Sequence, residues 1–501
     1  MPTDVALVDD LHNHVGRYVK LQGWVYNKRG SKGLLFLILR DGTGIVQCVV
    51  SQDAVDESSW QAAEMATQES ALTVAGTVKA DERQTGGVEI VASSVAIISV
   101  ASEYPITNKE HGIEFLMNNR HLWLRSRRQW AVLRIRNRVA MAIHEFFQKE
   151  GFLQLDAPIF TGNAVEGTTT LFGTDFFGET AYLTQSGQLH GEAMAMAFGK
   201  IYTFGPTFRA EKSKTRRHLS EFWMIEPEMA FYGLDRNMEL GEDFLIYIVG
   251  SVLAECRAEL EVLERDTSVL ERVKKPFPRL SYDDAVELLR SETTATLIAG
   301  RLETVTAEQR ALQEELEESK RLYGQAKKGE KRRLDARSVE INKRLADIEE
   351  DLRNFPSWAS SAAGFEWGSD FGGSDETLLT WHFDRPIIVH RFPASIKAFY
   401  MKRDPDDDRL ALGMDILAPE GYGEIIGGGE RATDLEFLKE QIRRHGLPES
   451  AFDWYLDLRR YGSVPHSGFG LGLERMVAWM CGLHHIREAI PFPRLMGRLS
   501  P

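Results

Sequence analysis

The first hundred residues alternate between short apolar runs and polar turns. The apolar runs lie at residues 19–26, 33–41, 44–50, 71–78 and 88–98, and Gly, Asp and Thr separate several of them. Runs of this length with such boundaries are typical of β-strands. One helical segment, residues 53–66, interrupts them. Five strands and one helix predict an OB-fold β-barrel over residues 1–102, with another kind of small β-domain as the alternative.

The next stretch, residues 103–130, is polar and contains Pro105, so it is predicted to form a linker or hinge. A short span of it carries four arginines: Arg120, Arg125, Arg127 and Arg128. Such a run is either a solvated face or a hinge that contacts phosphate groups.

Residues 131–501 mix helices with short strands, which predicts an α+β domain. Its first helix, over about residues 131–150, is amphipathic, ends at Gly151 and runs into a strand that closes at Pro158.

Residues 301–353 stand apart within this domain, because apolar residues recur there at steps of seven and four. Gly324 and Gly329 mark a turn between the two sets, which predicts an inserted antiparallel coiled-coil hairpin. The hairpin is either a surface arm without chemistry or a contact for RNA or a partner. The apolar positions are Val305, Leu312, Leu316 and Tyr323, and then Leu334, Ile341, Leu345, Ile348 and Leu352.

Composition narrows the class of protein. Of the 501 residues, 43% are hydrophobic, which is ample for large cores, and the net charge of −14 argues against binding nucleic acid through bulk positive charge. Three separated cysteines exclude a disulfide framework and a local cysteine zinc motif. No apolar run approaches 18 residues and the acidic start lacks a secretory signal, so we expect a cytoplasmic protein without a membrane span.

Two segments carry candidate chemistry. In residues 203–232, Arg209 and Glu211 end one strand, a basic loop follows, and Phe222 opens the next strand. Arg209 can bridge a phosphate and Phe222 can stack on a base, although a surface hairpin with an internal ion pair is the alternative. In residues 468–475, glycines permit close backbone approach beside Arg475. Neither segment is a Walker loop or a Rossmann turn.

Together with the helix and strand of residues 131–158, these segments resemble motifs 1, 2 and 3 of the class II aminoacyl-tRNA synthetases. The N-terminal OB-like domain points to the subgroup that charges Asp, Asn or Lys. Four strings resemble the asparaginyl-tRNA synthetases: YLTQSGQLHGE, RPIIVHRFPASIKAFYM, EIIGGGER and PHSGFGLGLER. The resemblance covers nearly the whole chain apart from residues 301–353, and it implies an antiparallel catalytic sheet flanked by helices.

The resemblance implies a two-step reaction in which ATP activates asparagine as an adenylate and the acyl group then moves to tRNA. Catalysis of this kind needs positioning and electrostatic stabilisation rather than a protein nucleophile. By motif match, Arg209 holds the α-phosphate and the substrate carboxylate, and Arg475 holds the γ-phosphate. The other residues implied to line ATP are Glu211, Arg217, His218, Phe222 under the adenine, and Glu424. Asp415 and Glu424 are the implied Mg²⁺ ligands, with two ordinary strand-end acids as the alternative.

The resemblance also implies an asparagine pocket made of Glu166, Ser186, Gln188, Glu192 and Arg431. The aspartyl relatives carry a lysine that would pair with the substrate carboxylate, and here that position is Gly191. We expect Glu192 to accept a hydrogen bond from the amide and to repel aspartate, while Arg431 donates to the amide oxygen.

Two positions of the OB-like domain, Phe36 and Gln47, match residues that bind the central anticodon base in this subgroup. Without the resemblance, Phe36 is more simply a core residue. The motif 1 resemblance further implies a homodimer. The alternatives are an aspartyl enzyme, including one that charges both tRNAs, a paralogue that amidates activated aspartate to asparagine, and a catalytically inactive binding module.

Overall fold

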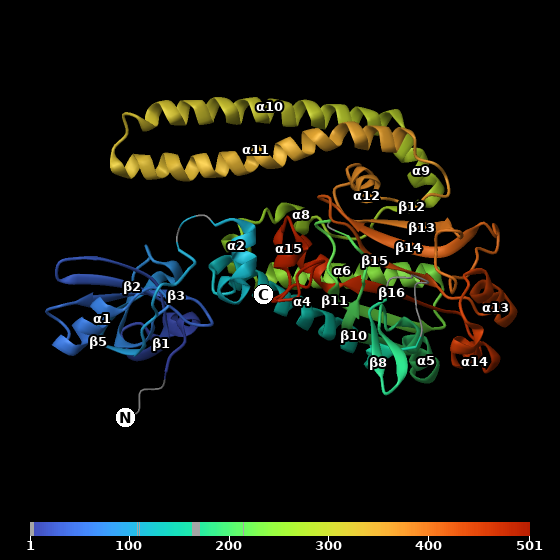
Figure 1. The fold of residues 1–501 in the computed structure, drawn as a ribbon, viewed down its shortest axis with the longest axis horizontal. Helices are drawn as coiled ribbons and strands as arrows, with labels where there is room; N and C mark the ends of the chain where they lie inside the picture. Colours follow the sequence, from blue (N-terminus) through green and yellow to red (C-terminus); the bar gives the residue numbers. More distant parts are fainter. Residues whose placement is uncertain (1–4, 108, 110, 163–170, 214, 501) are drawn as a thin grey trace. The chain divides into compact units, whose positions relative to one another are not determined.

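The computed structural model describes residues 5–107, 109, 111–162, 171–213 and 215–500. The chain divides into two compact units, Met1–Leu116 and Met117–Pro501, and each is described by itself. Figure 1 labels their helices and strands.

The first unit is a closed five-stranded β-barrel with the strand order β1-β2-β3-β5-β4 (Figure 1). Leu37 and Leu39 of β2 are buried in the core, whereas Phe36 and Ile38, on the other side of the strand, are only half-buried. The closed barrel confirms the predicted OB-fold. Its elements are η1 (Val8–His14), β1 (Tyr18–Ser31), β2 (Leu34–Arg40), β3 (Ile45–Ser51), α1 (Glu57–Met65), β4 (Ala71–Ala80), η2 (Thr85–Gly87) and β5 (Val88–Ser99).

The predicted linker contains helices: α2 (Ile113–Asn118), α3 (Arg120–Trp123) and the start of α4 (Arg127–Lys149). Arg120 is fully buried and donates to the carbonyls of Pro491 and Ile490 at 2.8 Å. Arg128 pairs with Glu488 at 2.9 Å. The hypothesis of a phosphate-contacting hinge is therefore wrong for these two arginines, which instead tie the beginning of the second unit to its end.

The second unit is built on an eight-stranded sheet with the order β12-β13-β14-β15-β16-β11-β10-β6. The six central strands pair antiparallel with one another, while the edge strands β6 and β12 pair in parallel with β10 and β13. The predicted antiparallel sheet is correct except at these edges. The strands are β6 (Leu153–Gln154), β10 (Lys200–Phe208), β11 (Glu221–Ala230), β12 (Arg279–Ser281), β13 (Ile387–Pro393), β14 (Leu410–Ala418), β15 (Gly423–Glu430) and β16 (His466–Gly472).

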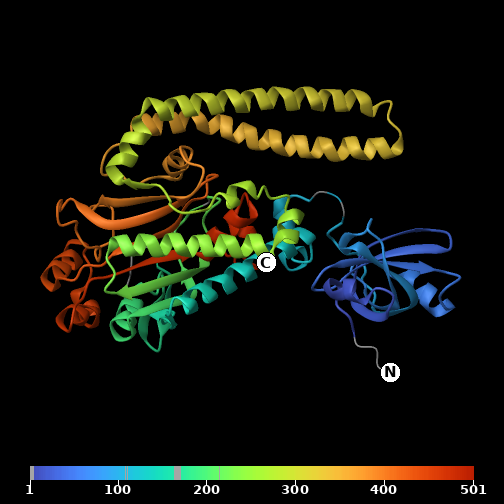
Figure 2. The ribbon, with the colours of Figure 1, turned by 180° about the vertical axis from the view of Figure 1, so that it is seen from behind.

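One face of this sheet is covered by α4, α6 (Leu234–Glu255) and α15 (Leu473–Cys481). Figure 2 shows α6, in green, lying across the sheet beside the blue-green α4. The helices bury aromatic and aliphatic side chains against alternate residues of the strands, for example Phe244 of α6 against Phe469 of β16. This leaves the opposite side-chain face of the central strands for a site.

The inserted arm is an antiparallel helical hairpin, as predicted, and is longer than expected. It consists of α10 (Glu292–Tyr323) and α11 (Lys328–Ala363). Ile341 and Ile348 are buried between the helices, whereas Tyr323 is partly exposed and contacts Lys331 of the facing helix. The turn spans residues 324–327, so Gly329 belongs to α11 rather than to the turn.

A small sheet with the order β7-β9-β8 lies beside the large one. In the described ranges, no helix is long and apolar enough to cross a membrane. The small strands are β7 (Phe160–Thr161), β8 (Gly173–Phe176) and β9 (Glu179–Leu183). The remaining helices are α5 (Gln188–Phe198), α7 (Arg257–Val262), α8 (Ser268–Glu271), α9 (Tyr282–Arg290), α12 (Gly373–Thr380), α13 (Leu435–Arg444), η3 (Glu449–Phe452), α14 (Asp453–Arg460) and η4 (Ile486–Glu488).

Candidate active site

A cleft of about 120 Å³ lies on the sheet face that the helices leave uncovered. In β11, Ile225 and Met229 pack into the helix-covered core, so the alternate residues Phe222 and Met224 point the other way, into the cleft. Gly470 and Gly472 of β16 also line it. Because these glycines have no side chains, the floor of the cleft stays open for a flat ligand.

Cationic side chains line one side of the cleft, namely Arg209, Arg217 and Arg475. The Arg209 guanidinium lies 5.4 Å from the centroid of the Phe222 ring. Arg217 donates to Glu376 at 3.1 Å and to the carbonyl of Gly421, and Arg475 donates to the carbonyl of Glu424. Three arginines around one aromatic platform suit a ligand with a base and several phosphates.

The loop between β10 and β11 supplies His218, which also lines the cleft, and Glu211. The Nε2 atom of His218 lies 3.5 Å from a carboxylate oxygen of Glu211. Burial lowers the pKa of His218, against the opposing influence of Glu211. The structure thus brings together all the predicted nucleotide residues: Arg209, Glu211, Arg217, His218, Phe222, Glu424 and Arg475.

The two predicted metal ligands, Asp415 of β14 and Glu424 of β15, both lie beside Gly427, where a side chain would collide with Glu424. Burial raises the pKa of Asp415 to about 7, with a further contribution from Glu424 and an opposing one from Lys397, whose Nζ lies 2.8 Å away. Burial and the nearby Glu424 also raise the pKa of Glu376 to about 7.

This carboxylate pair fits a magnesium ion. Mg²⁺ in phosphate-transfer sites is usually held by one or two carboxylates and by substrate phosphates. A cation between the two acids would stabilise the ionised form of Asp415, whose pKa is raised. In the described part of the chain no larger group of His, Cys, Asp or Glu is arranged to hold a metal ion. Phosphate oxygens would therefore have to complete the coordination.

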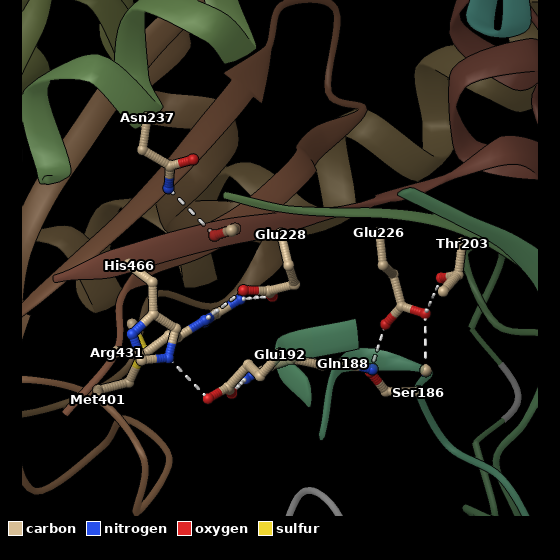
Figure 3. Close-up of polar contacts among 12 residues, drawn as sticks. Ser186, Gln188, Glu192, Thr203, Glu226, Glu228, Asn237, Met401, Arg431 and His466 are labelled. Atoms are coloured by element: carbon tan, nitrogen blue, oxygen red, sulfur yellow. Dashed lines mark hydrogen bonds and ion pairs between the residues drawn. The ribbon is translucent and has the colours of Figure 1, made fainter. Parts of the chain in front are cut away.

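The next residues along β11 are acidic and extend the cleft face toward a buried polar region (Figure 3). Glu226 accepts hydrogen bonds from the Ser186 hydroxyl and from the Gly187 amide, the latter at 2.8 Å. Two positions further on, Glu228 pairs with Arg431 of the β15 end at 2.5 Å. Both members of this ion pair are almost completely buried, at 1% and 3% exposed.

The structure corrects the role expected for Glu192. This carboxylate of α5 is fully buried and accepts hydrogen bonds from Tyr455 at 2.9 Å and Arg459 at 2.7 Å. It also contacts His466 at 2.9 Å and accepts from Gln188 at 3.1 Å (Figure 3). Although burial opposes its ionisation, Arg459 and His466 lower the pKa of Glu192. With its oxygens occupied by these neighbours, Glu192 does not present a free acceptor to a substrate amide.

Glu228 is the residue that sequence reasoning missed. Burial raises its pKa, and Arg431 opposes that rise. The signal for it was present, because the residues 222, 224, 226 and 228 share one strand face at a period of two. Of the other pocket predictions, Ser186, Gln188 and Arg431 lie in this region, and Glu166 lies outside the described residues.

In the barrel, Phe36 lies outside the core, so the interpretation of Phe36 as a core residue is wrong. The guanidinium of Arg29 lies 5.5 Å from the Phe36 ring centroid and donates to Gln47 at 2.9 Å. Gln47 in turn donates to Glu89 at 3.2 Å. Arg29 therefore contacts both of the predicted base-binding residues. Neither Arg29 nor Glu89 was singled out from the sequence.

Comparison with known proteins adds family relationships to this geometry. A family described as tRNA synthetases class II (D, K and N) matches residues 112–496, and an OB-fold nucleic acid binding domain matches residues 19–98. A Sorangium cellulosum protein named asparagine–tRNA ligase is 53% identical, with 99% of each chain covered.

Two solved structures are also similar. The asparaginyl-tRNA synthetase of Pyrococcus horikoshii, complexed with asparaginyl-adenylate, is 38% identical with a TM-score of 0.83, over 99% of this chain and 100% of that one. The asparaginyl-tRNA synthetase of Entamoeba histolytica, also with asparaginyl-adenylate, is 26% identical with a TM-score of 0.77 over the same shares.

Proposed function

The chain belongs to the class II tRNA synthetases of the D, K and N subgroup, and from this membership we propose that it joins asparagine to its tRNA through an asparaginyl-adenylate, using ATP and Mg²⁺. The observation that carries the proposal is full-length similarity, at 53% identity, to a relative named asparagine–tRNA ligase. Its test is pyrophosphate exchange into ATP that depends on asparagine.

The cleft supports the nucleotide half of the proposal. ATP would stack its adenine on Phe222 and place its phosphates among Arg209, Arg217 and Arg475. Arg209, whose guanidinium lies over the Phe222 ring, is the residue proposed to hold the α-phosphate and the amino-acid carboxylate. Asp415 and Glu424 would hold Mg²⁺, which would neutralise phosphate charge. In-line displacement at the α-phosphate then requires only positioned reactants and stabilised charge.

The Glu228–Arg431 pair supports asparagine over aspartate. A carboxamide has one acceptor and two donors, so an arginine beside a carboxylate offers it both kinds of partner. An aspartate side chain would bring a second negative charge against Glu228. In a buried region such repulsion strongly destabilises the bound aspartate. We therefore assign amide recognition to Glu228 and Arg431, and assign Glu192 to holding this region in place through Arg459 and His466.

This chemistry disfavours the alternatives. An aspartyl enzyme, whether or not it also charges the second tRNA, needs a cation free to meet the substrate carboxylate, but Arg431 is already paired with Glu228. A paralogue that amidates aspartate has no use for an anticodon-binding barrel. An inactive binding module would not need Arg209, Glu424 and Arg475 to converge on one cleft.

We expect the Phe36→Ala variant to weaken tRNA charging while leaving amino-acid activation intact. Loss of one aromatic stack costs about 1–3 kcal/mol, so the KM for tRNA should rise roughly 5- to 150-fold. Asparagine-dependent pyrophosphate exchange, measured without tRNA, should not change.

The matched control is Trp24→Ala, since Trp24 is another barrel aromatic that lies outside the core and under an arginine, Arg40. It should raise the KM for tRNA much less. A Phe36→Ala enzyme with a normal KM for tRNA would contradict the assignment of Phe36 to the anticodon.

We also propose a homodimer, supported by an aromatic patch on the small sheet. Phe160, Phe176 and Phe177 form it, with ring centroids 5.5 Å and 5.0 Å apart, and Phe177 is 94% exposed. The patch follows α4 and β6, the segment that matches motif 1. An apolar cluster this exposed is typical of a surface covered by a partner, here a second copy of the chain.

Light scattering should therefore give twice the 56.7 kDa mass of one chain. Phe177→Asp should shift the protein toward the monomer, because dimerisation would then bury a charge. The control Leu499→Asp alters a residue that is 83% exposed outside the patch, and it should remain dimeric. A monomeric wild-type protein at micromolar concentration would contradict the proposal.

A further inference from the structure

The charges of the inserted arm are segregated along its length. Residues 301–353 have 13 Lys and Arg against 13 Asp and Glu. Residues 320–333, which we call the basic tip, have seven of these cations and one acid, Glu330. The rest of the segment has six cations and twelve acids. An arm that is neutral overall thus presents a cationic end on a chain with a net charge of −14.

Two arginines of the stem pair with glutamates across the two helices. Arg337 pairs with Glu315 and Arg344 pairs with Glu308, each at 2.7 Å. Within the basic tip, Lys320 and Arg321 pair with Glu317 and Glu318 of their own helix, each at 2.7 Å, but two arginines have no such pair. These are Arg332 and Arg333, which are exposed, and neither pairs with a carboxylate of the described residues. Cations without carboxylate partners keep their full attraction for an external polyanion. The charges of Arg337 and Arg344 are instead partly neutralised by the glutamates beside them.

The root of the arm is anchored beside the active site. Glu350 of α11 pairs with Arg216, and the Nε2 atom of His484 lies 4.0 Å from the same carboxylate. Arg216 precedes Arg217 and His218, which line the cleft. At a rise of 1.5 Å per residue, Arg333 lies about 25 Å along α11 from Glu350. The basic tip therefore lies at the far end of the arm from Glu350, which pairs with the loop that borders the cleft. Figures 1 and 2 show the two helices of this arm.

We propose that the basic tip binds the phosphate backbone of the tRNA acceptor arm while the 3′ end of that tRNA reacts in the cleft. This inference rests on the proposed function, because it takes tRNA as the substrate. A tRNA whose end enters the cleft extends a charged duplex away from it, and the proposal takes that duplex to pass the tip, about 25 Å along α11 from Glu350. Lysine and arginine contacts to duplex phosphates position an RNA without reading its sequence.

The test compares two double variants of the full-length protein. Arg332→Gln with Arg333→Gln removes two exposed tip cations of α11. Arg310→Gln with Arg353→Gln removes two exposed stem cations, one from α10 and one from α11. Glutamine keeps a helix propensity close to that of arginine. The probes are whole tRNA and a minihelix that contains only the acceptor and T arms, each titrated at several salt concentrations.

The tip variant should bind both RNAs roughly 10- to 30-fold more weakly near 0.15 M salt, and its slope of log affinity against log salt should fall by about 2. The stem variant should bind both like the wild type. Tip and stem variants that bind the minihelix equally well would overturn the proposal, and so would a loss confined to whole tRNA. Asparagine-dependent pyrophosphate exchange should be normal in both variants, and its absence from the wild type would instead refute the proposed function.

Discussion

Replacing Arg209 with glutamine should lower asparagine-dependent pyrophosphate exchange by about 10²- to 10³-fold. Its guanidinium lies beside the Phe222 ring at the cleft, where charge on the α-phosphate would develop. A glutamine retains one donor but loses the positive charge and the two-pronged geometry. Because the arginine acts on the transition state more than on bound ATP, the loss should appear mainly in kcat.

A control for Arg209 is Arg236→Gln. Arg236 also lies over an aromatic ring, that of Tyr232 at 3.8 Å, but it is exposed on α6. This variant should exchange pyrophosphate at the wild-type rate. If Arg209→Gln has the wild-type melting temperature and retains more than a tenth of the wild-type rate, Arg209 does not stabilise the reacting phosphate.

The second large effect is expected at Glu228. Glu228→Gln should lower kcat/KM for asparagine and reduce the preference for asparagine over aspartate by about 10²-fold or more. The substitution removes the negative charge that repels aspartate, and it leaves the buried Arg431 without its ionic partner. An unpaired Arg431 would then attract the aspartate carboxylate.

Glu192→Gln is the matched comparison, because Glu192 is equally buried and is likewise paired with a buried arginine, Arg459. It should lower the melting temperature, since the hydrogen-bonded pair with Arg459 is broken, while the ratio of asparagine to aspartate activation stays near the wild-type value. The opposite pattern, with selectivity lost in Glu192→Gln and kept in Glu228→Gln, would restore Glu192 as the residue that selects the amide.

The sequence predicted those elements whose pattern is local. Alternating apolar runs identified the barrel, and steps of seven and four identified the arm, because each pattern repeats over neighbouring residues. The family motifs likewise pointed to residues that the structure gathers at one cleft, since Arg209 and Phe222 flank one hairpin loop.

The errors concern partners that are distant in sequence. Glu192 meets Arg459 from 267 positions away, and Arg120 meets Ile490 from 370 positions away. No local pattern shows that these side chains are satisfied inside the fold rather than free for a ligand. Glu228 was recoverable from the period of its strand, but its pairing with Arg431 depends on the order of β11, β16 and β15 in the sheet.

The sheet explains why the site lies where it does. Strand β16 alternates glycines with the core residues Phe469 and Leu471. Its helix-covered face therefore packs into the core, and its other face carries glycines without side chains. Gly470 and Gly472 line the cleft end of that face, and Gly468 lies against Glu228 at the other end. One strand thus leaves room for both the proposed nucleotide and the proposed amide-recognition pair in a single row.

Amino-acid-dependent exchange of pyrophosphate into ATP, with asparagine and aspartate compared on the purified protein, tests the central claim most directly. The account predicts exchange with asparagine, little exchange with aspartate, and loss of exchange when Mg²⁺ is chelated. Exchange that prefers aspartate, or a folded protein that exchanges with neither amino acid, would contradict it.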